Sequence, residues 1–202
     1  MRLAKLISLL LHPIVMPLVG LIIIFHSGVY SIDVPIEYKR FVYLIVILCN
    51  VLLPLSIIPG LMYFKHIQNY TMDARRERLI PLFFTTICYY IGYYFVAKFA
   101  SVRLINVFLF SSTLVILVVL SVSLFWKISI HMAGIGGLTG MILGISLVYG
   151  IDATIILSIS ILAGGLIAAS RLTLQTHTII QLVAGFFVGA CVVFGFVLQL
   201  IL

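Results

Sequence analysis

Two histidines with nearby serine and arginine residues are the groups in this sequence best suited to catalyse a reaction. His131 follows Ser129 by two residues, and His177 follows Ser170 and Arg171 by seven and six residues. Guanidinium groups pair with two phosphate oxygens at once, and imidazoles act as nucleophiles or as general acids and bases near neutral pH. These residue types therefore favour phosphoryl transfer through a phosphohistidine, in which one imidazole attacks phosphorus and the other protonates the leaving oxygen.

Further cations lie in the polar segment at residues 65–81. Its arginines Arg75, Arg76 and Arg78 are candidate phosphate ligands, and Arg78 is preferred because it lies closest to the next apolar run. Anchoring at lipid headgroups is a competing interpretation for Arg75 and Arg76, and also for Lys127.

Carboxylates are scarce in the polar segments, where Asp73 and Glu77 are the two that occur. Magnesium and calcium ions are bound mainly through oxygen ligands such as carboxylates, so we expect no metal ion and no other cofactor. Three further histidines lie singly in the sequence and are expected to be structural: His12, His26 and His66.

The composition places these polar segments in a membrane protein. Of 202 residues, 64% are hydrophobic and 8% charged, whereas soluble domains carry about a quarter charged residues. The apolar runs are continuous rather than alternating in polarity, which indicates helices rather than a barrel. The formal net charge of +7 rests on few charges and does not indicate a nucleic-acid partner. We therefore expect an all-α integral membrane protein whose partner is the lipid bilayer.

Seven apolar runs approach the ~20 residues that a spanning helix needs. The expected helices are 4–26, 41–64, 80–98, 104–126, 132–149, 153–169 and 178–201. Because the first run contains Pro13 and Pro17, it is kinked or partly re-entrant in this prediction, so the count is six to seven. We expect one transmembrane domain over residues 1–202.

The order of these helices predicts where the polar segments lie. Three polar connections stand out, at 65–81, 126–137 and 170–181, and two helices separate each from the next. An even number of crossings returns the chain to the same side, so we expect the three connections to converge on one membrane side. In this prediction 170–181 is a loop that leads into the last helix, with His177 near the first turn of that helix.

Two of these segments carry recognisable patterns. Ser170, Arg171 and His177 form Ser-Arg-x5-His, and Ser129 and His131 form Ser-x-His. The patterns resemble the third and second motifs of the type 2 phosphatidic acid phosphatase superfamily, which includes the lipid phosphate phosphatases. The resemblance covers roughly residues 65–200, in the same motif order and with the same helix pairs between motifs.

The sequence departs from the family's motifs in three places. The second motif, Pro-Ser-Gly-His, has Ile128 and Ile130 at its proline and glycine positions. The first, Lys-x6-Arg-Pro, is reduced to Arg78-x2-Pro81. The aspartate that ends the third motif, Ser-Arg-x5-His-x3-Asp, is replaced by Gln181. A glutamine four residues after the histidine can accept a hydrogen bond from its imidazole but cannot supply charge.

The resemblance implies a role for each position. His177 would be the nucleophile, His131 the acid that protonates the leaving alcohol, and Gln181 the residue that orients the nucleophile. The implied phosphate ligands are Ser129, Ser170, Arg171 and one or more of Arg75, Arg76 and Arg78. Glu77 is an alternative source of the missing carboxylate.

The activity implied is hydrolysis of a phosphomonoester or pyrophosphate of a lipid, such as phosphatidic acid or an isoprenyl pyrophosphate, in a multi-pass protein of the bacterial inner membrane. The rival hypothesis is a catalytically weak or inactive member of the fold that binds or transports an anionic lipid. The sequence leaves open which leaflet the site faces and whether the chain forms a homodimer.

Overall fold

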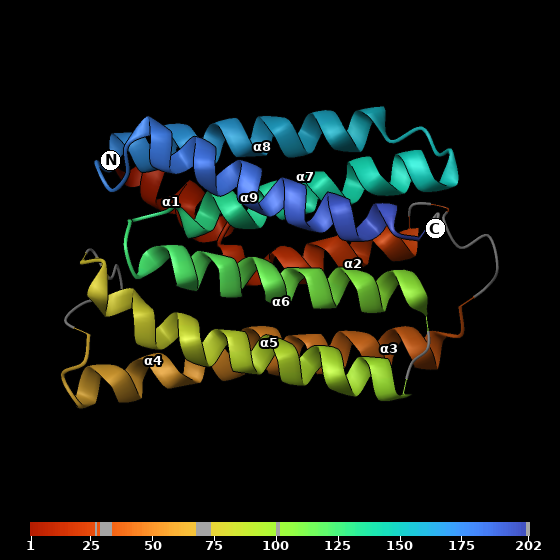
Figure 1. Cartoon of the computed structure of the whole chain (residues 1–202), viewed down its shortest axis with the longest axis horizontal. Helices are drawn as coiled ribbons and strands as arrows, with labels where there is room; N and C mark the ends of the chain where they lie inside the picture. Colours follow the sequence, from red (N-terminus) through yellow and green to blue (C-terminus); the bar gives the residue numbers. More distant parts are fainter. Residues whose placement is uncertain (27, 29–33, 68–73, 100–101, 201–202) are drawn as a thin grey trace.

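The chain folds into a bundle of helices (Figure 1). The computed structural model describes residues 1–26, 28, 34–67, 74–99 and 102–200, and no strand occurs among them. Within these residues, seven helical stretches are long and apolar enough to cross a membrane: Arg2–His26, Ile36–Tyr63, Arg76–Phe99, Arg103–Ser123, Ile130–Tyr149, Thr154–Thr173 and Ile179–Leu198. The prediction of an all-helical chain is thereby confirmed, and the seven stretches indicate a multi-pass membrane protein.

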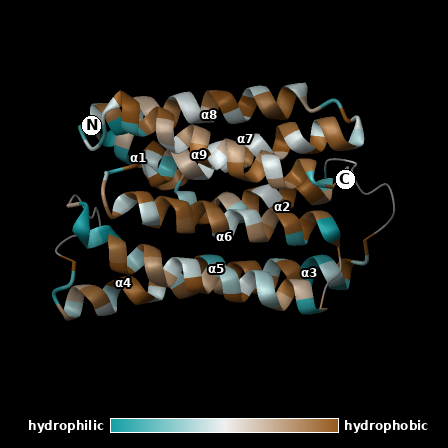
Figure 2. Cartoon of the chain, viewed as in Figure 1, coloured by the Kyte–Doolittle hydropathy of each residue, from teal (hydrophilic) through white to brown (hydrophobic). Residues whose placement is uncertain are grey.

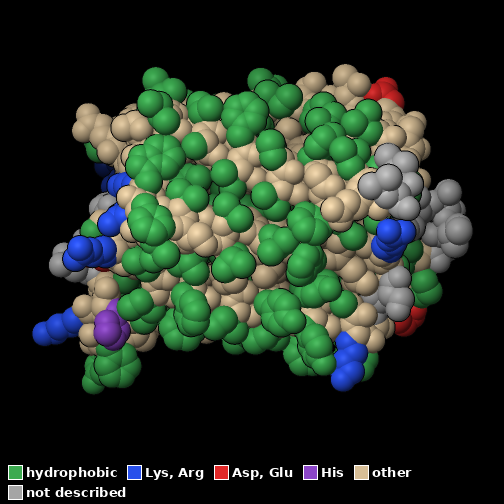
Figure 3. Space-filling model, viewed as in Figure 1, with side chains coloured by type: hydrophobic (Ala, Val, Ile, Leu, Met, Phe, Trp, Pro, Cys, Tyr) green, Lys and Arg blue, Asp and Glu red, His purple; other side chains and the backbone are tan. Residues whose placement is uncertain are grey.

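The surface agrees with this assignment. Hydrophobic residues run along the length of the helices, and hydrophilic residues gather towards the two ends (Figure 2). On the face shown in Figure 3, lysine and arginine side chains lie at the ends of the bundle and hydrophobic side chains cover the middle. A continuous exposed apolar surface of this kind is favourable in contact with lipid hydrocarbon and unfavourable in contact with water.

The first stretch is interrupted in the middle. Helix α1, Arg2–Leu10, ends before His12, and a 3-10 turn at Pro13–Val15 leads into α2, Met16–His26. A residue before proline is disfavoured in helical conformation, and His12 is extended, with φ −67° and ψ 136°. Its Nδ1 accepts a hydrogen bond from the N–H of Ile14 (3.3 Å). The predicted irregularity is therefore present. It is a break between α1 and α2, at which the His12 side chain caps the turn that follows.

The remaining helices are simpler. The second stretch consists of α3 (Ile36–Val46), a wider π-helical segment (Ile47–Leu52) and α4 (Leu53–Tyr63). The third consists of a 3-10 turn (Arg76–Arg78) and α5 (Leu79–Phe99). Each of the last four stretches is a single helix: α6 (Arg103–Ser123), α7 (Ile130–Tyr149), α8 (Thr154–Thr173) and α9 (Ile179–Leu198). In Figure 1 the starts of α5, α7 and α9 lie at the same end of the bundle, which is also the end where α1 begins.

The prediction that residues 170–181 form a loop is wrong for its first part. Helix α8 continues to Thr173, so Ser170 and Arg171 lie in its last turn. The Ser170 hydroxyl is satisfied inside the helix by donating to the Leu166 carbonyl (2.8 Å), which removes the reason for a polar residue to end the helix there. The helix ends where Gln175 adopts a positive φ of 52° and the N–H of residue 176 bonds the Arg171 carbonyl (3.2 Å), as in a Schellman cap.

Helix α7 lies at the centre of the bundle and packs most closely against α9. In an apolar 18-residue segment of α7, 67% of the residues are buried, whereas the corresponding share is at most 39% in the other six stretches of the described chain. Glycines make the close approach possible. A methyl group added at Gly136 would overlap the Phe186 carbonyl of α9, and one added at Gly189 would overlap the Ala133 carbonyl of α7. This contact fixes the start of α7 relative to the start of α9.

Substituting Gly136 by alanine is therefore expected to destabilise the protein by about 1–3 kcal/mol, the usual cost of overpacking. The matched control is Gly165→Ala on α8, where an added methyl group meets no atom within 4 Å and helix propensity improves. Thermal unfolding in detergent measures the melting temperatures of the two variants. If Gly136→Ala melted at or above the temperature of Gly165→Ala, the close α7–α9 packing would be refuted.

Candidate functional site

His177 lies directly before α9 and is held by the residue one turn into that helix. Its side chain is 7% exposed, and its Nδ1 lies 3.1 Å from Oε1 of Gln181. The same oxygen accepts the N–H of Thr178 (3.2 Å), completing a capping box at the helix start. An amide oxygen can only accept, so the proton of the neutral imidazole is on Nδ1 and the lone pair is on Nε2. The hydrogen bond expected between Gln181 and His177 is present, and Gln181 rather than Glu77 is the residue in contact with Nδ1.

Arg78 faces the other nitrogen of His177. It ends the turn before α5, is 5% exposed, and places Nη1 3.5 Å from His177 Nε2. The other two arginines of this segment lie elsewhere. Arg75 donates to the Leu124 carbonyl at the end of α6, and Arg76 is exposed. Asp73, which the sequence placed in the same segment, lies outside the described residues.

His131 lies in the first turn of α7, where α1 covers it. Its Nε2 lies 3.2 Å from the hydroxyl of Ser8 and 3.2 Å from the carbonyl oxygen of Ser8. Arg171 donates from Nη1 to the same hydroxyl (3.1 Å). The second histidine and the motif arginine are thus joined through a residue of the N-terminal helix, which lies outside the 65–200 segment covered by the family resemblance.

His12, expected to be a single structural histidine, has a partner in the structure. Its ring stands edge-on to that of His131, with centroids 5.3 Å apart. The sequence signalled the chain break here through Pro13, but nothing local linked His12 or Ser8 to a residue more than a hundred positions away.

The two motif serines have different hydrogen-bonding roles. Ser129 is fully buried and caps α7, where its hydroxyl accepts the N–H of Met132 (3.4 Å). Its own proton is therefore available to donate to an anion. Ser170 is also buried, but its proton is used on the Leu166 carbonyl. Of the two serines predicted as phosphate ligands, Ser129 is therefore the better suited to donate a hydrogen bond to phosphate.

The two histidine clusters form one site. The N–H of Ser129 donates to the Gln181 carbonyl (3.3 Å), which joins the start of α7 to the start of α9. Arg171 links the two histidines, because it donates to the Ser8 hydroxyl beside His131 and its positive charge acts on His177. Lys127 adds a further positive charge near His177. The result is a partly buried, positively charged cluster with two imidazoles, suited to an anion that has several oxygens.

This environment keeps His177 neutral. Burial, together with the Arg78 and Arg171 guanidinium groups, lowers the pKa of His177 from 6.5 to about 4. Between these pH values the unfolded chain takes up a proton here and the folded protein does not, so stability falls as the pH falls through this window. At neutral pH the imidazole needs no base to become a nucleophile.

An NMR titration of ¹⁵N-histidine-labelled protein in micelles, assigned with His177→Asn, measures this property. We expect a neutral His177 ring with its proton on Nδ1 at pH 7 and a titration midpoint near pH 4. A midpoint near 6.5, the ordinary value for histidine, or a proton on Nε2, would contradict the site geometry.

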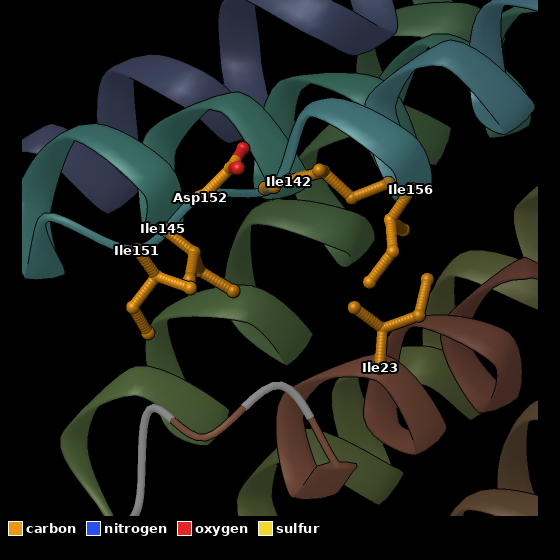
Figure 4. A pocket seen from close by; sticks show the side chains of 7 residues that line it. Ile23, Ile142, Ile145, Ile151, Asp152 and Ile156 are labelled. Atoms are coloured by element: carbon orange, nitrogen blue, oxygen red, sulfur yellow. The ribbon is translucent and has the colours of Figure 1, made fainter.

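Two cavities of the described chain lie away from this cluster. One, of about 40 Å³, is lined mainly by isoleucines of α2, α7 and α8, with Asp152 at its edge (Figure 4). It is little larger than the ~30 Å³ of one water molecule. Among the described residues, no group of three or more His, Cys, Asp or Glu side chains could hold a metal ion.

Comparisons with known proteins add no relative. No protein-family model, no curated protein and no solved structure matches the chain.

Proposed function

We propose that the protein is a membrane-bound lipid phosphatase that hydrolyses a phosphomonoester or pyrophosphate of a lipid through a phosphohistidine at His177. The observation that carries this proposal is the pair of contacts on the His177 ring. Gln181 holds the proton on Nδ1, and Arg78 lies 3.5 Å from Nε2. The Nε2 lone pair of His177, which would attack phosphorus, therefore lies next to the Arg78 guanidinium, which would attract the phosphate oxygens. The motifs resembling those of lipid phosphate phosphatases support the same assignment.

In the first step, Nε2 of His177 attacks phosphorus as the bond from phosphorus to the leaving oxygen breaks. His131, in its imidazolium form, gives its Nδ1 proton to that oxygen, and the lipid leaves as an alcohol, or as a monophosphate when the substrate is a pyrophosphate. Arg78, Arg171 and Ser129 donate to the three remaining phosphate oxygens, whose charge must be stabilised in the transition state. Arg78 and Ser129 are buried, which strengthens their interactions with the phosphate oxygens.

In the second step, water attacks the phosphohistidine. His131, now neutral, accepts a proton from the water, the P–N bond breaks, and inorganic phosphate is released with His177 restored. The same residue thus acts as acid and then as base, as microscopic reversibility allows.

The location of the cluster suits a lipid substrate. The three polar connections would share one membrane side, in a bacterial inner membrane, with the phosphate headgroup at the polar end of the bundle and the acyl or prenyl tail in the bilayer. No metal ion is required, because the charge stabilisation is assigned to arginines.

A second candidate function is binding or transport of an anionic lipid without turnover. The observation in its favour is Gln181, whose neutral amide cannot stabilise the positive charge that the His177 ring acquires when it is phosphorylated. The same arginines would then bind the headgroup and no bond would be broken.

Phosphate release by the purified protein tests the proposal. Phosphatidic acid, an isoprenyl pyrophosphate and a soluble aryl phosphate are each presented in mixed micelles. We expect release from at least one lipid substrate above that of the His177→Ala variant. Binding of these lipids without release above the variant would favour the second candidate, and the phosphatase proposal would fail.

A further inference from the structure

The hydroxyl of Ser8 lies between two groups that the proposed reaction must use together. It is 3.2 Å from His131 Nε2 and 3.1 Å from Arg171 Nη1. We propose that Ser8 is a positioning residue, which holds the general acid His131 and the phosphate-binding Arg171 in one hydrogen-bonded unit. This inference rests on the proposed function, and it adds the N-terminal helix to the site.

The chemistry of the partners settles the direction of each hydrogen bond. A guanidinium only donates, so the Ser8 hydroxyl accepts from Arg171. A carbonyl only accepts, so the 3.2 Å contact of the Ser8 carbonyl requires a proton on His131 Nε2. Ser8 therefore holds the Nε2–H side of the ring through both of its oxygens. The nitrogen left to serve a leaving group is Nδ1, which carries a proton when His131 is in its imidazolium form.

This arrangement follows a common pattern for functional histidines. One ring nitrogen donates to a backbone carbonyl or a carboxylate, and this bond fixes the tautomer and the orientation of the ring. Gln181 does the same for His177 through Nδ1. The two histidines are thus held by opposite nitrogens, each by a neutral residue, so both imidazoles are oriented without an added negative charge.

The sequence of α1 suits it to this position. Ala4 and Ser8 are four residues apart, lie on one face and are the buried residues of this helix, which packs against α8. Leu3, Leu6 and Leu9 point outward and are each more than half exposed. A small residue is needed at Ser8 because the helix must approach both α8 and the start of α7.

The turn that follows α1 packs against α7 and so helps to fix the position of Ser8 beside His131. The turn at Pro13–Val15 packs on α7, since a methyl group added at Gly134 would meet the Cβ of Pro13 at 3.1 Å. His12 adds the edge-on ring contact to His131. Ser8, His12 and Pro13 therefore reach the same turn of α7 from consecutive turns of the N-terminal chain.

The test compares two substrates with different needs for an acid. A phosphatidic acid alkoxide must be protonated as it leaves, whereas the nitrophenolate of p-nitrophenyl phosphate is stable without a proton. For Ser8→Ala we expect kcat/KM on phosphatidic acid to fall roughly 10- to 100-fold, the ratio expected from losing a hydrogen bond to a charged group. On p-nitrophenyl phosphate we expect a smaller fall, because only the effect through Arg171 remains.

The control variant is Ser121→Ala, whose exposed hydroxyl donates to the Leu117 carbonyl within α6. It should keep wild-type rates on both substrates, and Ser8→Ala should melt close to it. Equal losses on both substrates, or wild-type rates in Ser8→Ala, would overturn the positioning role while leaving the phosphatase proposal standing. If the wild-type protein hydrolysed neither substrate, the phosphatase proposal would fail and the role of Ser8 with it.

Discussion

Replacing His177 by alanine is expected to reduce lipid-phosphate hydrolysis by at least about 10³-fold, because no other group in the site would then accept the phosphoryl group. The neighbouring groups would remain. Arg78 comes from the turn before α5 and Arg171 from the last turn of α8, and neither depends on the imidazole for its backbone position. Binding of the phosphate headgroup should therefore be weakened far less than turnover. Initial rates of phosphate release, together with binding of a labelled lipid phosphate to the variant, measure the two effects separately.

The matched control for this substitution is His66→Ala. His66 is exposed and follows α4, in the segment that leads towards Arg78. Its replacement should leave the rate unchanged, because its side chain contacts none of the groups assigned to catalysis. Similar losses in the two variants would mean that the histidines act through folding, and the assignment of His177 as nucleophile would be wrong.

Replacing His131 by alanine is expected to lower kcat/KM for phosphatidic acid by about 10²- to 10⁴-fold, the usual contribution of a general acid. For p-nitrophenyl phosphate the loss in kcat/KM should be much smaller, because that leaving group needs no proton. The second step still needs His131 to activate water. A pre-steady-state burst of nitrophenolate followed by slow turnover is therefore expected in the variant, and stopped-flow absorbance measures it.

His26→Ala is the control here, since the His26 ring bonds the Ile22 carbonyl of its own helix and not the site. Rates on both substrates should match the wild type. If His131→Ala lost the same factor on both substrates and showed no burst, His131 would have a binding or structural role and not that of an acid.

The helices could be predicted from the sequence because their signal is local. A run of about 20 apolar residues can satisfy its backbone in lipid only as a helix, and seven such stretches are present in the described chain. The break at Pro13 was also encoded locally, by a proline that cannot continue a helix. The end of α8 was not. Ser170 looked like the start of a loop, but its hydroxyl bonds inside the helix.

The site residues were predicted only where a motif or a helical spacing linked them. Gln181 and His177 lie four residues apart, and their contact followed from that spacing. Ser8 and His131 are 123 positions apart, and their contact depends on how α1 packs on α7 and α8. Local sequence patterns carry no information on such a pair, so the N-terminal contribution to the site came from the structure alone.

The most direct test of the phosphohistidine mechanism is to trap the intermediate. The protein is mixed with a substrate carrying radiolabelled phosphate, quenched within the first turnover and separated from lipid. A phosphohistidine is stable in alkali and labile in acid, and we expect such a label on the peptide that contains His177 in the wild-type protein and none in His177→Ala. A label that is absent from turning-over wild-type protein, or that persists in His177→Ala, would contradict the mechanism.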